Sequence, residues 1–233
     1  MSFFRRFFGT FAEPAGTLRS LVARPVWVDT LIVVLIAYAA FSYLVFPFGQ
    51  KDSLRMLEDN AVRFTEKYGA EQYAAAANRI QSANRTLATC VLNPVTLLIG
   101  FLFSSLIALG LGKTISTEGH YLQVFSCLVH ANLVDKVLGN GLRLGLILAR
   151  GSTLQISTGL PVFFPRLAAT TTAYAALNQV DFFQLWMFGL FGLGLAAAFK
   201  VSVRKGLAVA GTVWLLKSLL MIGFALMQQR LFH

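Results

Sequence analysis

Five apolar stretches constrain this chain more than any other feature. They are bounded by charged or turn-forming residues and cover about Val26–Phe48, Val95–Gly112, Val124–Ala149, Phe182–Phe199 and Leu207–Met227. A helix needs about 20 mostly apolar residues to cross the hydrocarbon core of a bilayer. With 56% hydrophobic and 13% charged residues, the chain has more apolar surface than one soluble core can bury. The sequence therefore predicts an all-α fold, a polytopic membrane helix bundle with five transmembrane helices.

The segment between the first two stretches has a helical rhythm of its own. Apolar residues recur at steps of three and four, at Leu54, Leu57, Ala61, Phe64 and Tyr68 and, after Gly69, at Tyr73, Ala76, Ile80, Ala83 and Leu87. Such spacing is typical of an amphipathic helix, and a glycine between two helical patterns favours a turn. We therefore expect an outer helical hairpin over residues 50–92, which either caps the bundle or docks a protein outside the membrane.

Residues 1–25 precede the first stretch and are expected in the cytoplasm. Five phenylalanines, Phe3, Phe4, Phe7, Phe8 and Phe11, fall three and four apart, opposite Arg5 and Arg6. This pattern is typical of a helix that lies flat in the membrane interface or packs beneath the bundle. The chain thus divides into an amphipathic N-terminal segment, 1–25, and a five-span membrane domain, 26–233.

The basic residues near the span ends indicate the orientation. An internal N-terminus places eight of them in the cytoplasm, namely Arg5, Arg6, Arg19, Arg24, Lys113, Lys200, Arg204 and Lys205. Short cytoplasmic flanks carry such an excess of Lys and Arg. We expect a multi-pass protein of the bacterial inner membrane with its N-terminus cytoplasmic and its C-terminus outside. The net charge of +10 then meets lipid headgroups, and no motif for nucleic acid is present.

The segment from Arg150 to Val180 is too polar to span the membrane and too apolar to remain free in water. We expect a surface loop followed by a short interfacial helix.

Small residues at steps of four predict where helices pack closely. They are Gly100, Ser104, Ala108 and Gly112 in the second stretch, Gly141, Gly145 and Ala149 in the third, and Gly192 with Ala196 and Gly194 with Ala198 in the fourth. Lipid is as apolar as leucine, so membrane helices associate through close contacts of this kind. These grooves favour a compact bundle, but they also suit a second copy of the chain or another subunit.

Polar residues form one stripe along the third stretch. It consists of Asn132, Asp135, Lys136, Asn140 and Arg143, and Lys217 lies at a similar depth in the fifth stretch. A charge at mid-bilayer costs roughly 2.5 to 3.5 kcal/mol on insertion scales, so it needs a partner. We hypothesise that Asp135 meets Lys217, with Asn132 and Asn140 completing the hydrogen bonds. Arg143 and Lys136 either reach toward an outer cavity or compete for the same carboxylate. The cluster is either a static clamp between helices or a proton or substrate relay.

No catalytic motif accompanies this stripe. The three histidines, His120, His130 and His233, have no metal-ligand spacing, and Cys90 and Cys127 form no paired motif and are expected to be free thiols. Nucleotide-binding and hydrolase signatures are missing as well. The sequence gives no support for an enzyme, a metal or a cofactor.

Much of the chain resembles the Yip1 domain family, from the PAGTLRSLVARP stretch at residues 14–25 through five spans to the C-terminal end. The residues that carry the likeness are Asp181, Phe183 and Trp186, a glycine-rich stretch, and then Lys200, Arg204-Lys205 and Trp214. The resemblance implies a five-helix fold with a cytoplasmic N-terminus. Eukaryotic relatives contact small Rab-type GTPases and usually carry a D-L-Y-G-P motif, which this chain lacks. Some bacterial relatives resemble accessory subunits of ABC-type exporters and their extracytoplasmic adaptors.

Three functions follow as hypotheses. The first is a non-enzymatic inner-membrane scaffold or accessory subunit that assists a partner complex in the membrane or periplasm, such as an ABC-type export assembly. The second is a small transporter or channel with a polar pathway around Asp135, Asn140, Arg143 and Lys217. The third is a lipid-handling or membrane-shaping protein that uses its phenylalanine-rich N-terminus.

Overall fold

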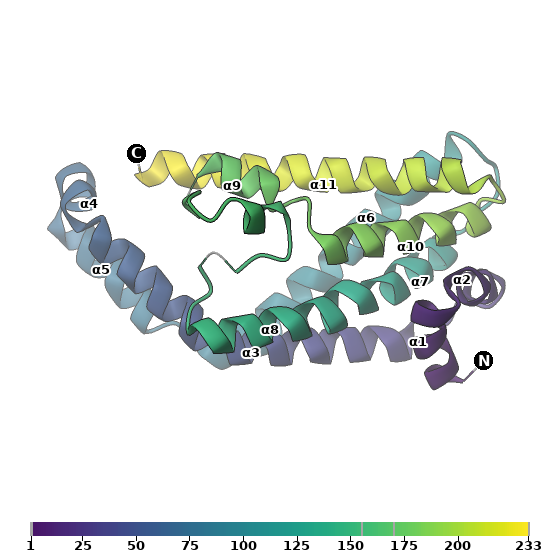
Figure 1. Ribbon diagram of the computed structural model, residues 1–233, viewed down its shortest axis with the longest axis horizontal. Coiled ribbons are helices and arrows are strands. Elements are labelled where there is room, and N and C mark those ends of the chain that lie inside the picture. Colours follow the sequence, from purple (N-terminus) through teal and green to yellow (C-terminus); the bar gives the residue numbers. More distant parts are fainter. Residues whose placement is uncertain (1, 155, 170, 233) are drawn as a thin grey trace.

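The computed structural model describes residues 2–154, 156–169 and 171–232 and shows an elongated helical bundle (Figure 1). The described residues contain no strand, only one isolated antiparallel bridge between Gly159 and Asp181. The long helices run roughly along the long axis, and the two ends of the chain lie at opposite ends of the bundle (Figure 1). The prediction of an all-α fold is therefore confirmed.

Three helices are long and apolar enough to cross a membrane. The first is α3 (Val28–Asp59), the second joins η1 (Leu87–Leu92) to α6 (Asn93–Lys113), and the third is the Val203–Met227 part of α11 (Val203–Phe232). The fourth predicted stretch forms α10 (Phe182–Ala198), which has 17 residues. At 1.5 Å per residue, α10 is about 25 Å long and falls short of a full crossing of about 30 Å.

The third predicted stretch lies within a continuous helical segment at the centre of the bundle. It comprises α7 (Tyr121–Asn132), the π-helical η2 (Leu133–Gly139) and α8 (Asn140–Arg150). Every residue from Val124 to Asp135 is buried, and α7 packs against α2, α3, α6 and α10. A helix that is buried on all sides meets protein rather than lipid, which explains how this segment accommodates polar side chains.

The N-terminal helices α1 (Phe3–Ala12) and α2 (Pro14–Ala23) close one end of the bundle (Figure 1). Phe7 and Phe11 pack against the core, whereas Phe4 and Phe8 stay 70% and 63% exposed. Arg6 is buried and forms an ion pair with Asp29 near the start of α3. The helix therefore packs beneath the bundle and also presents two phenylalanines outward, but Arg6 does not belong to a solvated face.

The predicted hairpin projects from the opposite end (Figure 1). It consists of the end of α3, then α4 (Ala61–Tyr68) and α5 (Ala70–Gln81), joined at Gly69 with φ of +88°. A positive φ is accessible to glycine without strain, which explains this residue at the turn. The Phe64 ring packs on those of Tyr68 and Tyr73, so part of the apolar face is satisfied within the hairpin.

A proline inside α3 leaves one carbonyl of this helix free to accept a hydrogen bond from the segment that follows the hairpin. Pro47 has no N–H, so the carbonyl of Tyr43 receives no helical hydrogen bond from it. Arg85 instead donates to this carbonyl from Nε at 2.9 Å and from Nη2 at 2.6 Å, and its guanidinium lies 3.6 Å from the centre of the Tyr43 ring. The segment after α5 is thereby fastened to α3.

The segment after α8 has an exposed part and a short helix, as expected, but its first part folds back against the bundle and is buried at Ser157 and Gly159. It contains η3 (Leu160–Phe163) and α9 (Thr172–Leu177), and α9 packs on α11 (Figure 1). Ser157 and Gly159 are buried here, whereas Val162, Phe163 and Phe164 are exposed. Non-helical backbone is tolerated within membranes where protein buries it. The backbone at Ser157 and Gly159 meets this condition.

Close helix contacts occur at some of the predicted small residues. In the second predicted stretch, a Cβ on Gly112 would overlap the Phe199 ring, and Ala108 is fully buried. The C-terminal half of this stretch therefore packs closely against the rest of the bundle. Gly206, which the sequence reading missed, is another close approach: a Cβ there would lie 2.7 Å from the backbone nitrogen of Ala196. The predicted pairs on α10 are close contacts as well: a Cβ on Gly192 would lie 2.9 Å from the Leu207 Cα, one on Gly194 would lie 2.6 Å from the Cys127 Cβ, and Ala196 and Ala198 are buried. The other predicted positions are more open: Ser104 is half-buried, Ala149 is exposed, and Gly100, Gly141 and Gly145 have nothing described within 4 Å of an added Cβ.

Candidate functional site: a buried polar cluster

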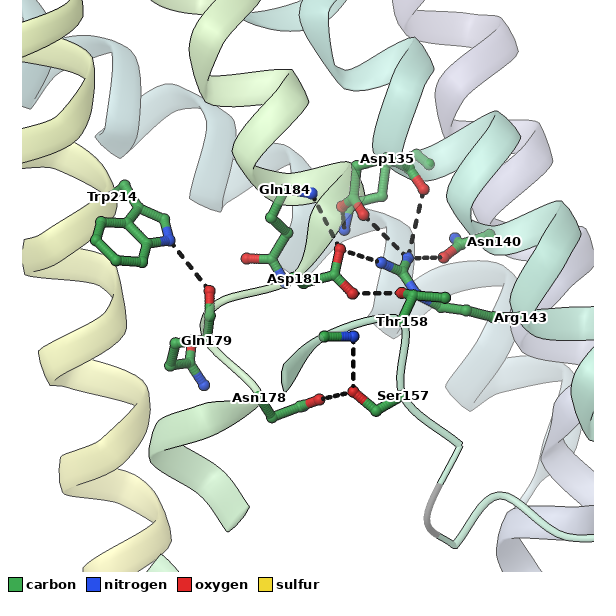
Figure 2. A network of polar contacts seen from close by, with 12 residues as sticks. Asp135, Asn140, Arg143, Ser157, Thr158, Asn178, Gln179, Asp181, Gln184 and Trp214 are labelled. Carbon is green, nitrogen blue, oxygen red and sulfur yellow. Dashed lines mark hydrogen bonds and ion pairs between the residues drawn. The ribbon is translucent and has the colours of Figure 1, made fainter. Parts of the chain in front are cut away.

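Arg143 on α8 is the centre of the polar cluster (Figure 2). Its Nη1 donates to Asp135 Oδ1 and to Asn140 Oδ1, both at 2.9 Å, and its Nη2 donates to Asp181 Oδ1 at 2.9 Å. Its Nε donates to Thr158 Oγ1 at 3.1 Å. We call these five residues the Arg143 cluster. The planar guanidinium suits this arrangement because its donors point in fixed, diverging directions.

Asp135 on η2 is held by two cations from its own helical segment. Lys136 Nζ lies 2.7 Å from Oδ2, and Arg143 Nη1 lies 2.9 Å from Oδ1. The Lys136 ammonium also lies 5.6 Å from the centre of the Tyr38 ring on α3, within the range of a cation–π contact. Both carboxylate oxygens of Asp135 are thus paired, and the side chain is only 4% exposed.

Asp181 connects the cluster to the start of α10. Its Oδ1 accepts a hydrogen bond from the Gln184 backbone N–H at 3.0 Å, which caps the helix, and its Oδ2 accepts one from the Thr158 hydroxyl. An aspartate is favoured at this position because it satisfies a free N–H and complements the positive end of the helix dipole. Arg143 therefore ties the beginning of α10 to α8 and η2.

The backbone bridge beside Asp181 brings Thr158 into place. Leu160 N donates to Val180 O at 3.1 Å, and Phe182 N donates to Thr158 O at 3.2 Å. The Ser157 hydroxyl adds a hydrogen bond to Asn178 Oδ1 at 2.6 Å (Figure 2). These contacts position the segment after α8 and supply the hydroxyl that completes the shell around Asp181.

Two predicted members of the cluster make other contacts. Lys217 donates to Gln184 Oε1 instead of pairing with Asp135, and Asn132 Nδ2 donates to the Leu128 carbonyl of its own helix at 2.9 Å. The expected Asp135–Lys217 ion pair is therefore replaced by the pairs from Lys136 and Arg143. The physical reason is reach: both cations share a helical segment with Asp135, and the guanidinium bridges two carboxylates at once.

A second polar chain, which was not predicted, involves His130 in the last turn of α7. His130 is fully buried; its Nε2 lies 3.0 Å from Thr30 Oγ1 and its Nδ1 lies 2.9 Å from the Ser126 carbonyl. Thr30 follows Asp29, the partner of Arg6. A Thr one residue after an intramembrane Asp was the available signal, but no sequence rule places it opposite a histidine a hundred positions away.

Asp52 near the base of the hairpin is another polar contact that the sequence reading missed. Its Oδ2 accepts hydrogen bonds from the backbone N–H and the hydroxyl of Thr153, both at 2.6 Å, and its two oxygens accept from the Ser152 hydroxyl at 3.0 Å. The carboxylate is buried by these contacts. It anchors the start of the folded-back segment to α3.

The residues that carry the family likeness lie around the cluster. Phe183 lies under the Arg143 guanidinium at 5.7 Å, and Trp214 donates from Nε1 to the Gln179 carbonyl at 3.2 Å (Figure 2). Trp186 contacts the rings of Phe11 and Phe182. Lys200 has a positive φ of 53° in the turn between α10 and α11 and pairs with Glu118 at 3.0 Å. Together they organise α10 and its two ends.

The Arg143 cluster is a set of buried ion pairs and hydrogen bonds that joins η2 and α8 to the start of α10. Within the described residues, no group of three or more His, Cys, Asp or Glu side chains could hold a metal ion. The carboxylates of the Arg143 cluster accept hydrogen bonds from cations, hydroxyls and a backbone N–H. In a medium of low dielectric such pairs are strong, and removal of one partner leaves an uncompensated buried charge.

Comparison with known proteins gives one match. The family model of the Yip1 domain matches residues 8–225, nearly the whole chain. Neither the curated proteins nor the solved structures contain a match. The matched range includes α2 to α10, the Arg143 cluster and almost all of the apolar part of α11. The chain therefore belongs to the Yip1 domain family of multi-pass membrane proteins.

Proposed function

We propose that this protein is a non-enzymatic accessory subunit that assists a partner membrane complex through its projecting hairpin. The observation that carries the proposal is the hairpin itself, whose helices α4 and α5 contain no buried residue. A two-helix extension that adds nothing to the core is retained at a cost in conformational entropy. Contact with a partner outside the membrane gives such an extension a purpose.

The surface of the hairpin suits a protein partner. Val62 on α4 is 70% exposed, and the same helix carries charges of both signs at Arg63, Glu66 and Lys67. An apolar side chain within a rim of mixed charges is the usual composition of a protein contact. The resemblance to accessory subunits of ABC-type exporters makes an extracytoplasmic adaptor of such an assembly the proposed partner.

The orientation of the bundle agrees with this role. The basic residues Arg5, Arg19, Arg24 and Lys113 belong to the segments at the end of the bundle that carries the N-terminus, and the hairpin lies at the other end (Figure 1). Because Lys and Arg are enriched in cytoplasmic flanks, we place the N-terminal end in the cytoplasm and the hairpin outside. Under this proposal all five predicted stretches lie in the bacterial inner membrane, and four of them cross it fully, whereas α10 is too short to do so as a helix alone.

Quantitative affinity purification from native membranes tests the proposal. At equal amounts of inserted protein, Val62→Asp should lose a stoichiometric partner that the wild type retains, because a charge replaces the exposed apolar side chain. Ala12→Asp, a matched change at the exposed end of α1, should retain it. Recovery of the wild-type chain alone under gentle detergent and several growth conditions would contradict the proposal.

A transporter is the second candidate, favoured by the irregular helix at Asp135. The π-helical η2 surrounds this carboxylate, and α10 begins in the interior at Asp181. Such features occur at binding sites within membranes. Asp135→Asn separates the two functions: lower amounts of inserted protein support a clamp, whereas normal insertion with loss of a transport activity supports a pathway.

A further inference from the structure

A cavity of about 530 Å³ lies where the hairpin meets the bundle, away from the Arg143 cluster. One face of α3, from Phe41 to Ser53, forms its long wall, and α5, η1 and the first residue of α6 close it. At 1.5 Å per residue this wall is about 18 Å long. Its volume lies within the range of about 300 to 1,000 Å³ that is usual for small-molecule sites.

The α3 wall of the cavity becomes more polar along its length. Phe41, Val45 and Phe46, together with Ser42, line the part that belongs to the apolar stretch of α3, whereas Gln50, Ser53 and Arg79 line the part beyond Phe48. The end of the apolar stretch marks the boundary between hydrocarbon and headgroups. The cavity therefore crosses this boundary, with the two phenylalanines on the membrane side and Arg79 on the outer side, and Thr89 and Asn93 add polar groups from η1 and α6.

Arg79 provides a charge at the polar end. Of the described residues that line the cavity, it alone is charged, and it makes no hydrogen bond or ion pair with any residue that the structure describes. Arg85, six positions later, is committed to the Tyr43 carbonyl and ring. The two arginines thus have separate roles: Arg85 fixes the hairpin base, and Arg79 is available to an anion.

We propose that this cavity binds an anionic phospholipid of the surrounding bilayer. One acyl chain lies against Phe41, Val45 and Phe46, and the phosphate receives the guanidinium of Arg79. A guanidinium matches phosphate oxygens in geometry as well as in charge. A soluble anion would use only the polar end, whereas a phospholipid uses both ends of the cavity. The bound lipid would lie between α3 and α5 and so brace the hairpin against the bundle.

Native mass spectrometry of the detergent-purified full-length protein tests this site. The probes are phosphatidylglycerol and phosphatidylcholine with identical acyl chains, together with inorganic phosphate. Both lipids carry a phosphate, but the choline cation of phosphatidylcholine cancels its net charge, so Arg79 should favour phosphatidylglycerol. A charge contact near a membrane surface contributes about 1 kcal/mol, so the wild type should bind phosphatidylglycerol about fivefold more tightly than phosphatidylcholine. Inorganic phosphate at the same concentration should not displace the lipid.

Three variants assign the effect to the cavity. Arg79→Gln should abolish the preference for phosphatidylglycerol, and Ala83→Trp should weaken both lipids because the indole fills the space. Arg63→Gln, a matched loss of charge at an exposed position on α4, should bind like the wild type. The proposal is overturned if Arg79→Gln keeps the wild-type preference, if Ala83→Trp binds both lipids normally, or if phosphate competes as well as phosphatidylglycerol.

Discussion

The interior of the bundle and the hairpin place their polar and apolar side chains in opposite surroundings. In the interior, the side chains of Arg143, Asp135 and Asp181 are 17%, 4% and 5% exposed, and Arg143 forms an ion pair with each of the two carboxylates. In the hairpin, α4 and α5 contain no buried residue, and Val62 is almost as exposed as a side chain in solution. The charged side chains of the interior form ion pairs with one another, whereas the side chains of the hairpin remain accessible to a partner.

This difference separates stability from interaction. A buried pair is strongly destabilising to break because the remaining charge has no solvent, whereas a change at an exposed position usually alters stability by less than about 0.5 kcal/mol. Substitutions in the Arg143 cluster should therefore act on the fold. Substitutions on the hairpin should act on partners, and at its base on the angle between hairpin and bundle.

The largest effect is expected for Arg143→Gln. The change leaves Asp135 and Asp181 without their shared cation, and the loss of a buried pair costs about 3 to 5 kcal/mol. Thermal unfolding of the detergent-solubilised protein should show a clear drop in melting temperature, and Arg143→Lys should fall between, because lysine keeps the charge without the planar donors. A melting temperature equal to that of the wild type would show that the Arg143 cluster does not stabilise the fold.

A smaller effect is expected at the start of α10. Asp181→Asn keeps an acceptor for the Gln184 N–H, whereas Asp181→Ala loses both the cap and the pair with Arg143. The alanine variant should therefore be less stable than the asparagine variant by about 1 kcal/mol, the usual value of a helix cap. Equal unfolding midpoints for the two variants would show that the cap contributes nothing here.

At the hairpin base, Arg85→Gln should cost about 1 kcal/mol, since it removes the hydrogen bonds to the Tyr43 carbonyl. The cost should shrink in a Pro47→Ala background, where residue 47 regains an N–H that can donate to the same carbonyl. A double-mutant cycle on the free energy of unfolding measures this coupling. Independent effects of the two substitutions would contradict the assignment.

The smallest effect on stability is expected for Val62→Asp. Because the side chain is exposed, the free energy of unfolding should stay within about 0.5 kcal/mol of the wild type. The same unfolding assay applies, with Val134→Asp in the buried segment as the comparison. A Val62→Asp protein as unstable as Val134→Asp would mean that the hairpin contributes to the core.

The sequence was sufficient for the elements whose signal is local. Apolar length predicted α3, α6 and α11, helical spacing predicted the hairpin, and Gly69 marked its turn. The count of five crossings stays a prediction, since α10 is short and the central segment is charged. These helices were readable because membrane insertion and periodicity depend on neighbouring residues alone.

The cluster was predictable only in part: Asp135, Asn140 and Arg143 were predicted, whereas Asp181 and Thr158 were not, and Asn132 and Lys217 make other contacts. Asp135, Asn140 and Arg143 share a helical face in the sequence, but the π-helical η2 shifts that face, and the partner of Arg143 comes from a different segment. Asp181 was notable only through the family likeness, and Thr158 gave no signal. The fold-back of the segment after α8 depends on tertiary contacts that no local pattern records.

The proposed role of the hairpin requires it to lie across the membrane from the N-terminus, and thiol labelling measures this directly. In a protein with Cys90 and Cys127 replaced by serine, single cysteines at Ser2 and Ser82 would be treated with a membrane-impermeant maleimide in intact cells with an opened outer membrane. We predict labelling of Ser82→Cys before lysis and of Ser2→Cys only after the inner membrane is permeabilised. Labelling of both positions from the same side would contradict the account.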